Sequence, residues 1–535
     1  EMQRSLVGSE MCIRDSANTF GQHNISALGG FEQYYEKGES YNASRSGYDF
    51  SIDQMGVGPA NDQLNGGSES ELGRAAWIGQ VKYNYANKYY AEGSIRYDGS
   101  DYFAPGHRWG AFFSGALGWV ISEEKFMKSL VEKNIFNSLK LRASYGQTGL
   151  DSSAGRFAYL TSYSLNNQAY VINGKYVPGF SEGKLPSPDL TWYTTRQTDI
   201  GFDFASLNNR LYGSFDYFYY STKGYLQSPT GESYLNTSIG VGLPSVKSDS
   251  EFRREGWELQ LGWRSNVGDL KYDISGNFTY FDQLWALNRS ESESSYMNPY
   301  TRQQQQKGYY GVLYKNLGYY KNADDVLNSP GYVSGLNSGY LTAGDIKYED
   351  TNGNGMIDGG DQRRLGKASM PRGQFGINMN FQYKGFYLSM LFQGSTNFGM
   401  YIPGSAAMQT GQAGTLPVAF DYQTDTWTPN NRDAKYPRLM ANTSLNSNNN
   451  YQSSDFWLIN GAYLRMKDFQ FGYDLKHSLL RSVAWLSRAK VGISGQNIFT
   501  ISQATKFGLD PENSSAENYG YPVERVIAFT INLGF

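Results

Sequence analysis

The chain has 535 residues, with 47 Lys and Arg against 50 Asp and Glu, so its formal net charge is −3. No basic excess exists to hold a nucleic acid backbone, which argues against nucleic acid as a partner. Mean hydropathy is −0.55. The longest nearly apolar run, at 111–121, is far shorter than the ~20 residues of a membrane-spanning helix. These values exclude a helical membrane protein.

The composition is typical of β structure, with 44 Tyr, 61 Gly and an aromatic share of 16%. A polar average is compatible with a membrane β-barrel, because only every second residue of each strand faces lipid while the others face water. Composition therefore favours an all-β fold and permits such a barrel.

The first sixteen residues differ from the rest of the chain. They contain the single cysteine, Cys12, and show no alternation of apolar and polar residues. Their last eight, SEMCIRDS, resemble translated sequencing-adapter read-through. We therefore predict that 1–16 are a non-native segment and that the native sequence here is 17–535. The remaining chain has no cysteine, which rules out disulfides and thiol chemistry there.

Alternating segments of about ten residues, the length of a tilted membrane strand, follow along the whole chain. In the last of them, Ile527, Phe529, Ile531, Leu533 and Phe535 are apolar, and the residues between them are small or polar. We expect about 14 antiparallel strands, at 21–36, 75–86, 88–98, 109–121, 137–148, 191–206, 209–222, 255–266, 269–282, 374–384, 385–396, 461–473, 488–500 and 523–535.

The connections between these segments alternate in length. Tight turns are expected at 87–88, 208–209, 266–269 and 384–385, and long polar loops near 37–74, 150–190, 223–254, 283–373, 397–460 and 501–522. Outer-membrane barrels have short periplasmic turns and long extracellular loops. A soluble all-β array gives no reason for this rhythm. The pattern therefore predicts a transmembrane barrel whose C-terminus lies on the periplasmic side.

Several stretches resemble one known family. They are KYYAEGSIRYDGSDYFAPGHRWGAFFSGALGWVISEEKFMK at 88–128, LTWYTTRQTDIGFDFASLNNRLYGSFDYFYYSTKGYL at 190–226, the DTNGNGMIDGGD core within 344–372, the stretches 463–475 and 495–512, and the C-terminal 522–535. Together they are similar to the SusC/RagA family of TonB-dependent outer-membrane transporters of Bacteroidetes, from about residue 20 to the end.

This resemblance implies a large outer-membrane barrel closed by a plug. It also implies a SusD-like surface lipoprotein as a lid, an oligosaccharide or peptide as ligand, and TonB as the source of energy. No TonB box or plug is identified in this chain, and about eight of the ~22 strands of such transporters are missing. The chain is therefore expected to be the C-terminal part of the barrel, with TonB acting through the missing N-terminal region.

The loop 350–361 has the spacing of a calcium-binding loop, which supplies oxygen ligands from positions 1, 3, 5, 7, 9 and 12 around a glycine at position 6. Gly355 stands at position 6. The candidate ligands are Asp350, Asn352, Asn354, the Met356 carbonyl, Asp358 and Asp361. The ion would be structural, and the alternative is a Gly- and Asn-rich hairpin tip held by Asx turns.

Catalytic patterns are weak in this sequence. The three histidines, His23, His107 and His477, are widely spaced, and neither a nucleophile elbow nor a phosphate-binding loop is present. We predict no catalytic residues and no organic cofactor. Two other functions remain open, namely a passive porin or adhesin-type barrel and a soluble, secreted glycan-binding β protein.

Overall fold

The computed structural model describes residues 2–48, 54–57, 59, 63–151, 155–227, 240–244, 246–308, 311–332, 341–402, 424–439, 449–513 and 523–535. Within these residues, no helix is both long enough and apolar enough to cross a membrane.

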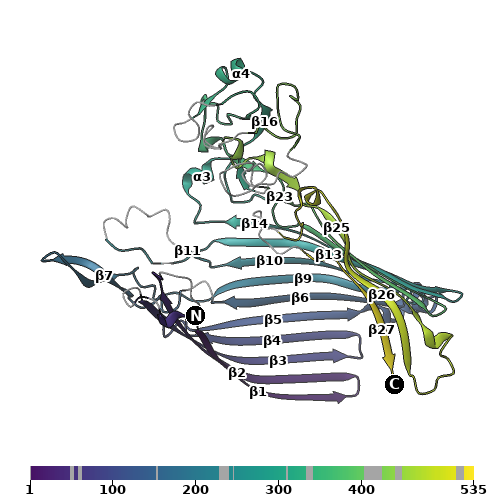
Figure 1. Ribbon diagram of the computed structural model, residues 1–535. Helices are drawn as coiled ribbons and strands as arrows, with labels where there is room; N and C mark the ends of the chain where they lie inside the picture. Colours follow the sequence, from purple (N-terminus) through teal and green to yellow (C-terminus); the bar gives the residue numbers. More distant parts are fainter. Residues whose placement is uncertain are drawn as a thin grey trace.

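One curved antiparallel sheet of fifteen strands dominates the structure (Figure 1). Its strands, in spatial order, are β1 (Met2–Phe20), β2 (His23–Arg45), β3 (Gln63–Tyr85), β4 (Tyr89–Ser100), β5 (Trp109–Val120), β6 (Ser138–Leu150), β9 (Tyr193–Ser206), β10 (Leu211–Lys223), β13 (Glu251–Val267), β14 (Leu270–Leu287), β21 (Gly373–Tyr383), β22 (Phe386–Thr396), β25 (Tyr463–Asp474), β26 (Arg488–Ser502) and β27 (Val526–Gly534).

All fourteen expected strands are confirmed, and the strands of the sheet follow one another in chain order, with the other strands lying in the connections between them. The additional strand is β1, which runs through the segment 1–16 and pairs with β2 along its whole length. Backbone pairing alone does not establish whether this segment is native, so its origin stays a prediction.

Short turns and long loops alternate along most of the sheet, as the sequence predicts. The long loop expected near 37–74 is wrong at both ends, because β2 continues to Arg45 and β3 already begins at Gln63. Gly268 and Gly385 occupy tight turns with φ of +57° and +89°, a conformation that glycine adopts without a steric penalty. The long connections carry the remaining strands, which form two-stranded pairs. These are β7 (Tyr163–Ile172) with β8 (Lys175–Glu182), β11 (Leu226–Gln227) with β12 (Val246–Lys247), β15 (Gly311–Leu313) with β20 (Arg363–Leu365), β16 (Asn316–Tyr319) with β18 (Ile346–Tyr348), β17 (Gly331–Tyr332) with β19 (Met356–Ile357), and β23 (Gly399–Tyr401) with β24 (Leu458–Asn460).

Helices are short and lie in the connections. The α-helices are α1 (Lys128–Glu132), α3 (Glu293–Met297) and α4 (Ala323–Leu327), and the 3-10 helices are η1 (Met55–Val57), η3 (Ile121–Glu123), η4 (Lys125–Met127), η6 (Gly359–Asp361), η9 (Asn449–Tyr451), η10 (Asp455–Trp457), η11 (Leu475–His477) and η12 (Ala504–Phe507).

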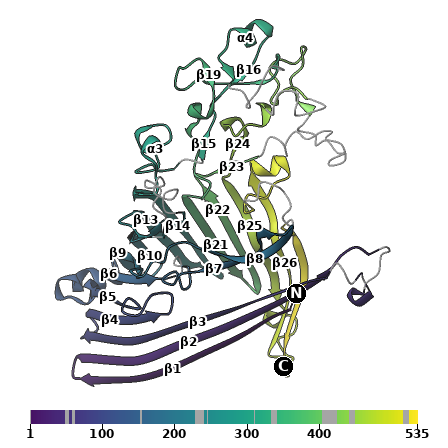
Figure 2. The same ribbon diagram turned by 90° about the vertical axis from the view of Figure 1, so that its left-hand side faces the viewer.

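The long loops after β14, β22 and β26 meet in one body, which we call the loop cluster (described residues of 311–365, 399–460 and 504–512). It stands above β14 in Figure 1 and beyond the upper ends of β22, β25 and β26 in Figure 2. Its buried centre consists of Tyr314, Ile346, Tyr348, Ile357, Ile402, Tyr436, Trp457, Ile459 and Ala504. The largest apolar core of the described chain therefore lies in the loops, because the sheet itself has little packed against it.

The sheet is open within the described residues, since β1 and β27 form its two ends and do not pair with each other. It curves strongly, so that β26 and β27 run across the direction of the first strands in Figure 1. Such coiling follows from the right-handed twist of successive strands. The sheet has the form of a barrel wall that does not close on itself.

Candidate transport site

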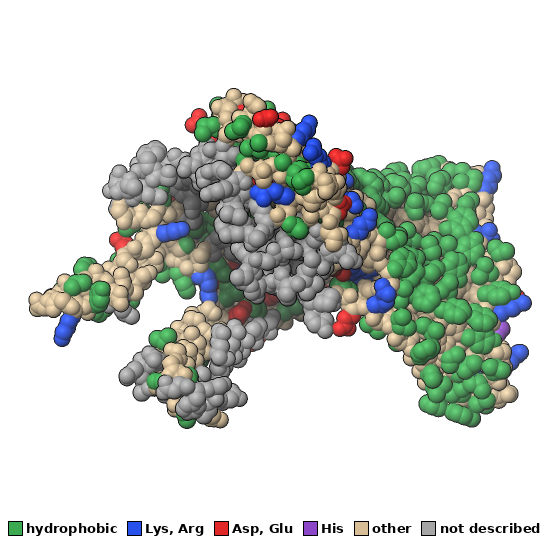
Figure 3. Space-filling model, turned by 45° about the horizontal axis from the view of Figure 1, so that its top comes forward, with side chains coloured by type: hydrophobic (Ala, Val, Ile, Leu, Met, Phe, Trp, Pro, Cys, Tyr) green, Lys and Arg blue, Asp and Glu red, His purple; other side chains and the backbone are tan. Residues whose placement is uncertain are grey.

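The two faces of the sheet differ sharply in chemistry. Residues opposite one another in paired strands point to the same face. One cross-strand row reads Phe529, Ile493, Phe471, Leu388, Phe381 and Tyr272 from β27 to β14. Phe529 is 83% exposed. Figure 3 shows hydrophobic side chains gathered over the strands to the right of the view. We call this surface the apolar face.

The opposite face, which we call the inner face, is polar. The next row reads Thr530, Gly492, Gly472, Tyr387 and Gln382, and another reads Ser494, Gln470, Ser389, Asn380 and Asp273. A sheet with one apolar and one hydrated face is the arrangement of a membrane barrel wall. The apolar positions predicted in the last strand lie exposed on the apolar face, as a lipid contact requires.

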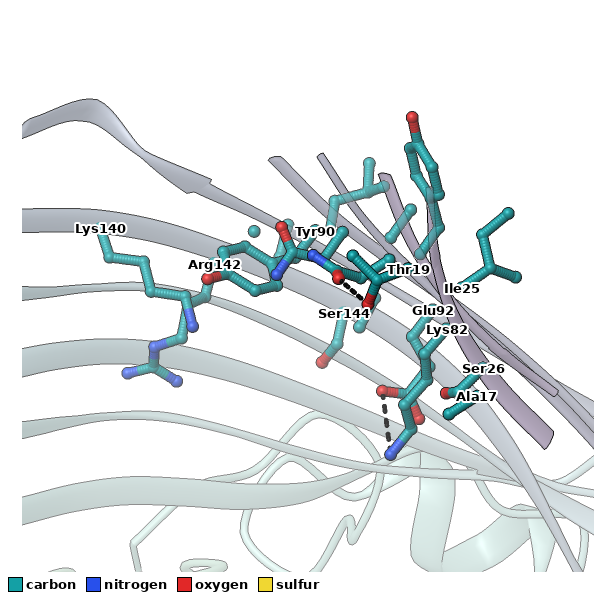
Figure 4. A pocket seen from close by; sticks show the side chains of 18 of the residues that line it. Ala17, Thr19, Ile25, Ser26, Lys82, Tyr90, Glu92, Lys140, Arg142 and Ser144 are labelled. Carbon is teal, nitrogen blue, oxygen red and sulfur yellow. Dashed lines mark hydrogen bonds and ion pairs between the residues drawn. The ribbon is translucent and has the colours of Figure 1, made fainter. Parts of the chain in front are cut away.

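The inner face of β3 to β14 carries fixed charges. Arg142 on β6 pairs with Asp203 of β9 at 2.8 Å and with Asp216 of β10 at 3.0 Å. Lys82 of β3 lies 3.9 Å from Glu92 of β4, and these two side chains are joined in Figure 4. They line a concave region of about 700 Å³ near the short-turn end of the strands. This part of the wall can therefore contact charged or strongly hydrated groups.

The inner face of β21 and β22 carries no charge. From the loop end to the turn end, the inward positions of β21 are Gln374, Gly376, Asn378, Asn380 and Gln382. Those of β22 are Ser395, Gln393, Leu391, Ser389 and Tyr387. The inner wall is therefore divided into a charged part and a part dominated by amides and hydroxyls.

A second cavity, of about 920 Å³, lies at the loop end of this uncharged part. Its lining consists of Asn277, Thr279, Ser369, Met370, Pro371, Gln374, Phe375, Gly376, Leu391, Gln393, Gly394, Ser395, Phe398, Tyr463, Pro511 and Glu512. Strand residues form its wall, and loop residues at 369–371, 398 and 511–512 form its rim. We call it the rim cavity.

A buried ion pair fixes one side of the rim cavity. Arg465 of β25 is 2% exposed. It donates from Nη1 to Glu512 at 2.6 Å, from Nη2 to Asp510 at 2.7 Å, and from Nε to the hydroxyl of Thr500 at 2.9 Å. Charge-assisted bonds of this kind are strong when they are shielded from water. The loop after β26 is therefore tied to the wall of the sheet.

A second buried network holds the loop cluster together. Asp345 is fully buried. Its carboxylate accepts from Nε of Arg438 at 2.8 Å and from Nδ2 of Asn450 at 2.9 Å. Asn450 in turn accepts from the backbone N–H of Ile346 at 2.8 Å. Two loops more than ninety residues apart are thereby locked against each other. Burial raises the pKa of the Tyr348 hydroxyl beside this network well above its usual range.

The predicted calcium loop forms a tight, internally hydrogen-bonded turn. Asp350 accepts from the backbone N–H groups of Gly353 and Gly355 at 2.7 and 2.8 Å. The amides of Asn352 and Asn354 accept from backbone N–H groups two residues on, and Asn354 Nδ2 lies 3.4 Å from Asp358. The loop thus brings the first, third, fifth and ninth ligand positions together.

Asp361, at the twelfth position, has a different environment. It is fully buried and accepts from the backbone N–H groups of Thr351 at 2.9 Å and Asp358 at 2.7 Å. No three Asp, Glu, His or Cys side chains in the described part of the chain form a group able to hold a metal ion. A cation in this loop would therefore need the amide and carbonyl oxygens in addition to the carboxylates, and calcium stays a prediction.

The strand β1 departs from the pattern of the sheet. Its register with β2 places Arg14, Ser16 and Asn18 on the apolar face, opposite Gly29, Ala27 and Ile25. Met11 and Ile13, which are 57% and 53% exposed, lie on the inner face. At these positions, polar residues on the lipid side and apolar residues on the water side reverse the arrangement of β2, while Asp15 lies on the inner face as expected of a charged residue. The origin of 1–16 stays a prediction.

Comparison with known proteins identifies the family. A family model described as "TonB dependent receptor-like, beta-barrel" matches residues 13–355, more than half of the chain. The chain belongs to this family. It is a family of outer-membrane transporters and not of enzymes, so the outer membrane is the location of this TonB-dependent receptor barrel. The match begins at residue 13, slightly before the predicted native start at 17.

Individual relatives agree with this assignment. TonB-dependent receptor P3 of Formosa agariphila is 27% identical over an alignment that covers 97% of this chain and 51% of that protein. TonB-dependent receptor SusC of Bacteroides thetaiotaomicron is also 27% identical, over 86% of this chain and 43% of that protein. The SusC/RagA resemblance is confirmed, and this barrel spans about half the length of the curated relatives it matches.

A solved structure shares the fold. The RagAB peptide importer in the "open-open" state superposes with a TM-score of 0.75, at 20% sequence identity, over 95% of this chain and 52% of that chain. The same importer in the "closed-closed" state gives a TM-score of 0.73. At this level of identity the likeness concerns the fold of the TonB-dependent receptor barrel.

Proposed function

We propose that this barrel is the wall of an outer-membrane nutrient importer that takes up oligosaccharides or peptides. A SusD-like lipoprotein would capture the ligand at the loop side, and TonB would supply the energy through a part of the protein outside this chain. No covalent chemistry is involved, and the protein is not an enzyme.

The observation that carries this proposal is the pairing of an apolar face with a divided, polar inner face, on a chain of the TonB-dependent receptor family. Relatives named SusC and RagAB support a SusD-like partner and an imported ligand. A soluble glycan-binding protein would not expose a continuous apolar row such as that from Phe529 to Tyr272. A passive porin remains the competing function, since it would share the same wall.

Uptake measurements distinguish the importer from the porin. Deletion of the gene in its native host should abolish growth on one class of oligosaccharide or peptide as sole nutrient. Growth on the corresponding monomers serves as the control. Addition of a protonophore should stop uptake by wild-type cells, because TonB needs the proton gradient. Uptake that persists after protonophore treatment would favour a passive porin instead.

We also propose that the loop 350–361 holds a structural Ca²⁺ ion through Asp350, Asn352, Asn354, the Met356 carbonyl, Asp358 and Asp361. The oxygen-only donor set is the type that Ca²⁺ prefers. Gly353 and Gly355 have positive φ angles of +71° and +81°, which permit the sharp turn. The ion would stiffen one edge of the loop cluster.

A further inference from the structure

The uncharged part of the inner wall has a chemistry that selects among ligands. Two of its amide side chains, those of Gln374 and Gln393, line the rim cavity together with the amide of Asn277 on the neighbouring strand β14. Asn277 and Gln393 flank Gly376 in one cross-strand row, and Gln374 lies one row nearer to the loops. The three amides thus form a compact patch, which we call the amide patch.

The amide patch is free to bind a ligand. All three residues are exposed, and no side-chain hydrogen bond engages their amides within the part of the chain that the structure describes. By contrast, Asn380 on the same wall accepts from Ser389 at 2.8 Å. Each free amide offers both a donor and an acceptor, as does a sugar hydroxyl. The amide patch can therefore both donate hydrogen bonds to vicinal hydroxyls of a saccharide and accept hydrogen bonds from them.

The rim of the cavity supplies apolar surface beside the amide patch. Met370 is 45% exposed at the rim and Pro371 next to it is partly exposed, whereas Phe398 and Pro511 of the same lining are buried. Apolar surface beside a few directed polar groups is typical of a ligand site. The C–H faces of a sugar ring would pack against this rim while its hydroxyls meet the amides.

The charge of the cavity argues against a charged ligand. The single charged residue in its lining is Glu512. This carboxylate already accepts from Arg465 at 2.6 Å, from Tyr463 at 3.1 Å and from Lys467 at 3.2 Å. A free carboxylate or ammonium group brought into the cavity would lack a counter-charge and would lose its hydration. Peptide termini and uronic acids carry such groups, whereas neutral sugars do not.

A peptide also cannot bind here by adding a strand to the sheet, because the backbone groups of the strands are already paired. β21 pairs with β14 on one side and β22 on the other, and β22 pairs in addition with β25. No strand edge is left there to which an extended peptide could add. We infer that the rim cavity and its amide patch bind a neutral oligosaccharide, an inference that rests on the proposed import function and narrows its substrate class.

Binding by the protein as its gene encodes it, purified in detergent, tests this inference. Calorimetric titration would use malto-, cello-, xylo- and mannohexaose as neutral probes, with oligogalacturonic acid and a tryptic digest of casein as charged ones. At least one neutral hexaose should bind more tightly than either charged probe. The triple variant Asn277→Ala, Gln374→Ala, Gln393→Ala should bind that hexaose about tenfold or more weakly, because three neutral hydrogen bonds are removed.

Gln80→Ala is the matched control, since Gln80 is an amide on the charged part of the inner wall and bonds to Glu92 at 2.6 Å. It should leave the affinity within about twofold of the original. Unchanged electrophoretic mobility of the unheated triple variant would verify that the barrel is folded. Wild-type affinity in the triple variant, binding of the charged probes alone, or no binding of any neutral hexaose would each overturn the inference.

Uptake separates this inference from the proposed function. Deletion of the gene could leave uptake intact while the purified protein binds a neutral hexaose through the amide patch. That result would refute the proposed import function and support the binding site. Uptake could instead require the gene while the triple variant binds and transports normally. That result would support the import function and refute ligand binding by the amide patch.

Discussion

Arg465 shows how one buried cation can organise a loop. Its replacement by alanine would remove the hydrogen bonds to Thr500, Asp510 and Glu512 and leave the two carboxylates without their buried counter-charge. We expect local destabilisation of about 3 kcal/mol, the range seen when a buried pair loses one member. The measurement is limited proteolysis of intact cells or detergent-solubilised protein, in which the segment 503–513 should be cut much faster.

Lys467→Ala is the control for this prediction. Lys467 also contacts Glu512, at 3.2 Å, but its side chain is 37% exposed. Exposed pairs contribute only about 0–1 kcal/mol, so proteolysis of the same segment should hardly change. Equal cleavage of both variants would show that burial of Arg465 does not hold the loop.

Asp325, in the short helix α4, gives the loop cluster a dependence on pH. The Lys347 ammonium at 2.8 Å and the backbone N–H of Lys321 at 3.0 Å lower the pKa of this carboxyl. Because the folded pKa lies below the unfolded one, the stabilisation is present above the unfolded pKa. It is lost as pH falls through the folded pKa.

We therefore expect the amides of 321–328 to lose protection as pH falls below about 4, the ordinary range of an aspartate. Hydrogen exchange, corrected for the intrinsic rate at each pH, would detect this change. Asp325→Asn should remove the pH dependence of that segment and weaken its protection near neutral pH. The effect is below about 1 kcal/mol, since the pair is partly hydrated. An unchanged pH profile in this variant would contradict the assignment.

At the level of elements, the loop 350–361 should respond to Ca²⁺ in two separable ways. Asp350→Ala together with Asp361→Ala should abolish any calcium-dependent rise in melting temperature. Asp361→Ala alone should lower stability by about 1–3 kcal/mol even in a chelator, since the backbone N–H groups of Thr351, Asn352 and Asp358 lose their acceptor. Differential scanning fluorimetry with Ca²⁺ and with EDTA measures both effects. A wild-type calcium shift in the double variant would exclude this loop as the site.

The strand β5 allows a direct test of the two faces. Phe113, 54% exposed, lies on the apolar face opposite Ile95, whereas Ser114 lies on the inner face opposite Ser94. Phe113→Lys should destabilise the barrel in liposomes by about 2–4 kcal/mol if it lies near the bilayer midplane. Ser114→Lys should be tolerated, because its ammonium reaches water. Denaturant titration compares the two variants, and equal losses of stability would contradict the assignment of the faces.

Individual strands were predictable from the sequence because the signal is local. Every expected span, from 21–36 to 523–535, contains a strand of the sheet, since lipid on one side and water on the other impose a strict alternation. The turn positions followed from the same reasoning. The loop cluster was not predictable in this way. Asp345 contacts Arg438 and Asn450, which lie in a distant loop. The periodicity of the sequence does not predict such contacts. The rim cavity was missed for the same reason.

At the scale of the whole molecule, the open edges of the sheet have a practical consequence. β1 and β27 each pair on one side within the described residues, and unpaired strand edges promote aggregation. Residues 17–535 expressed alone should therefore give no monodisperse, detergent-soluble barrel in size-exclusion chromatography. Co-expression with the rest of the receptor is the control. A stable monodisperse species from 17–535 would show that the sheet can close by itself.

The division of the inner wall also governs how water is held inside the barrel. Around Arg142, Asp203 and Asp216, fixed charges bind water and small ions firmly and resist their displacement. Beside Asn378 and Gln393, neutral dipoles exchange their water easily. A solute moving through the interior would displace bound water with the smallest free-energy cost along the uncharged wall of β21 and β22. Its route would then run off-centre, close to β21 and β22, and would not follow the axis.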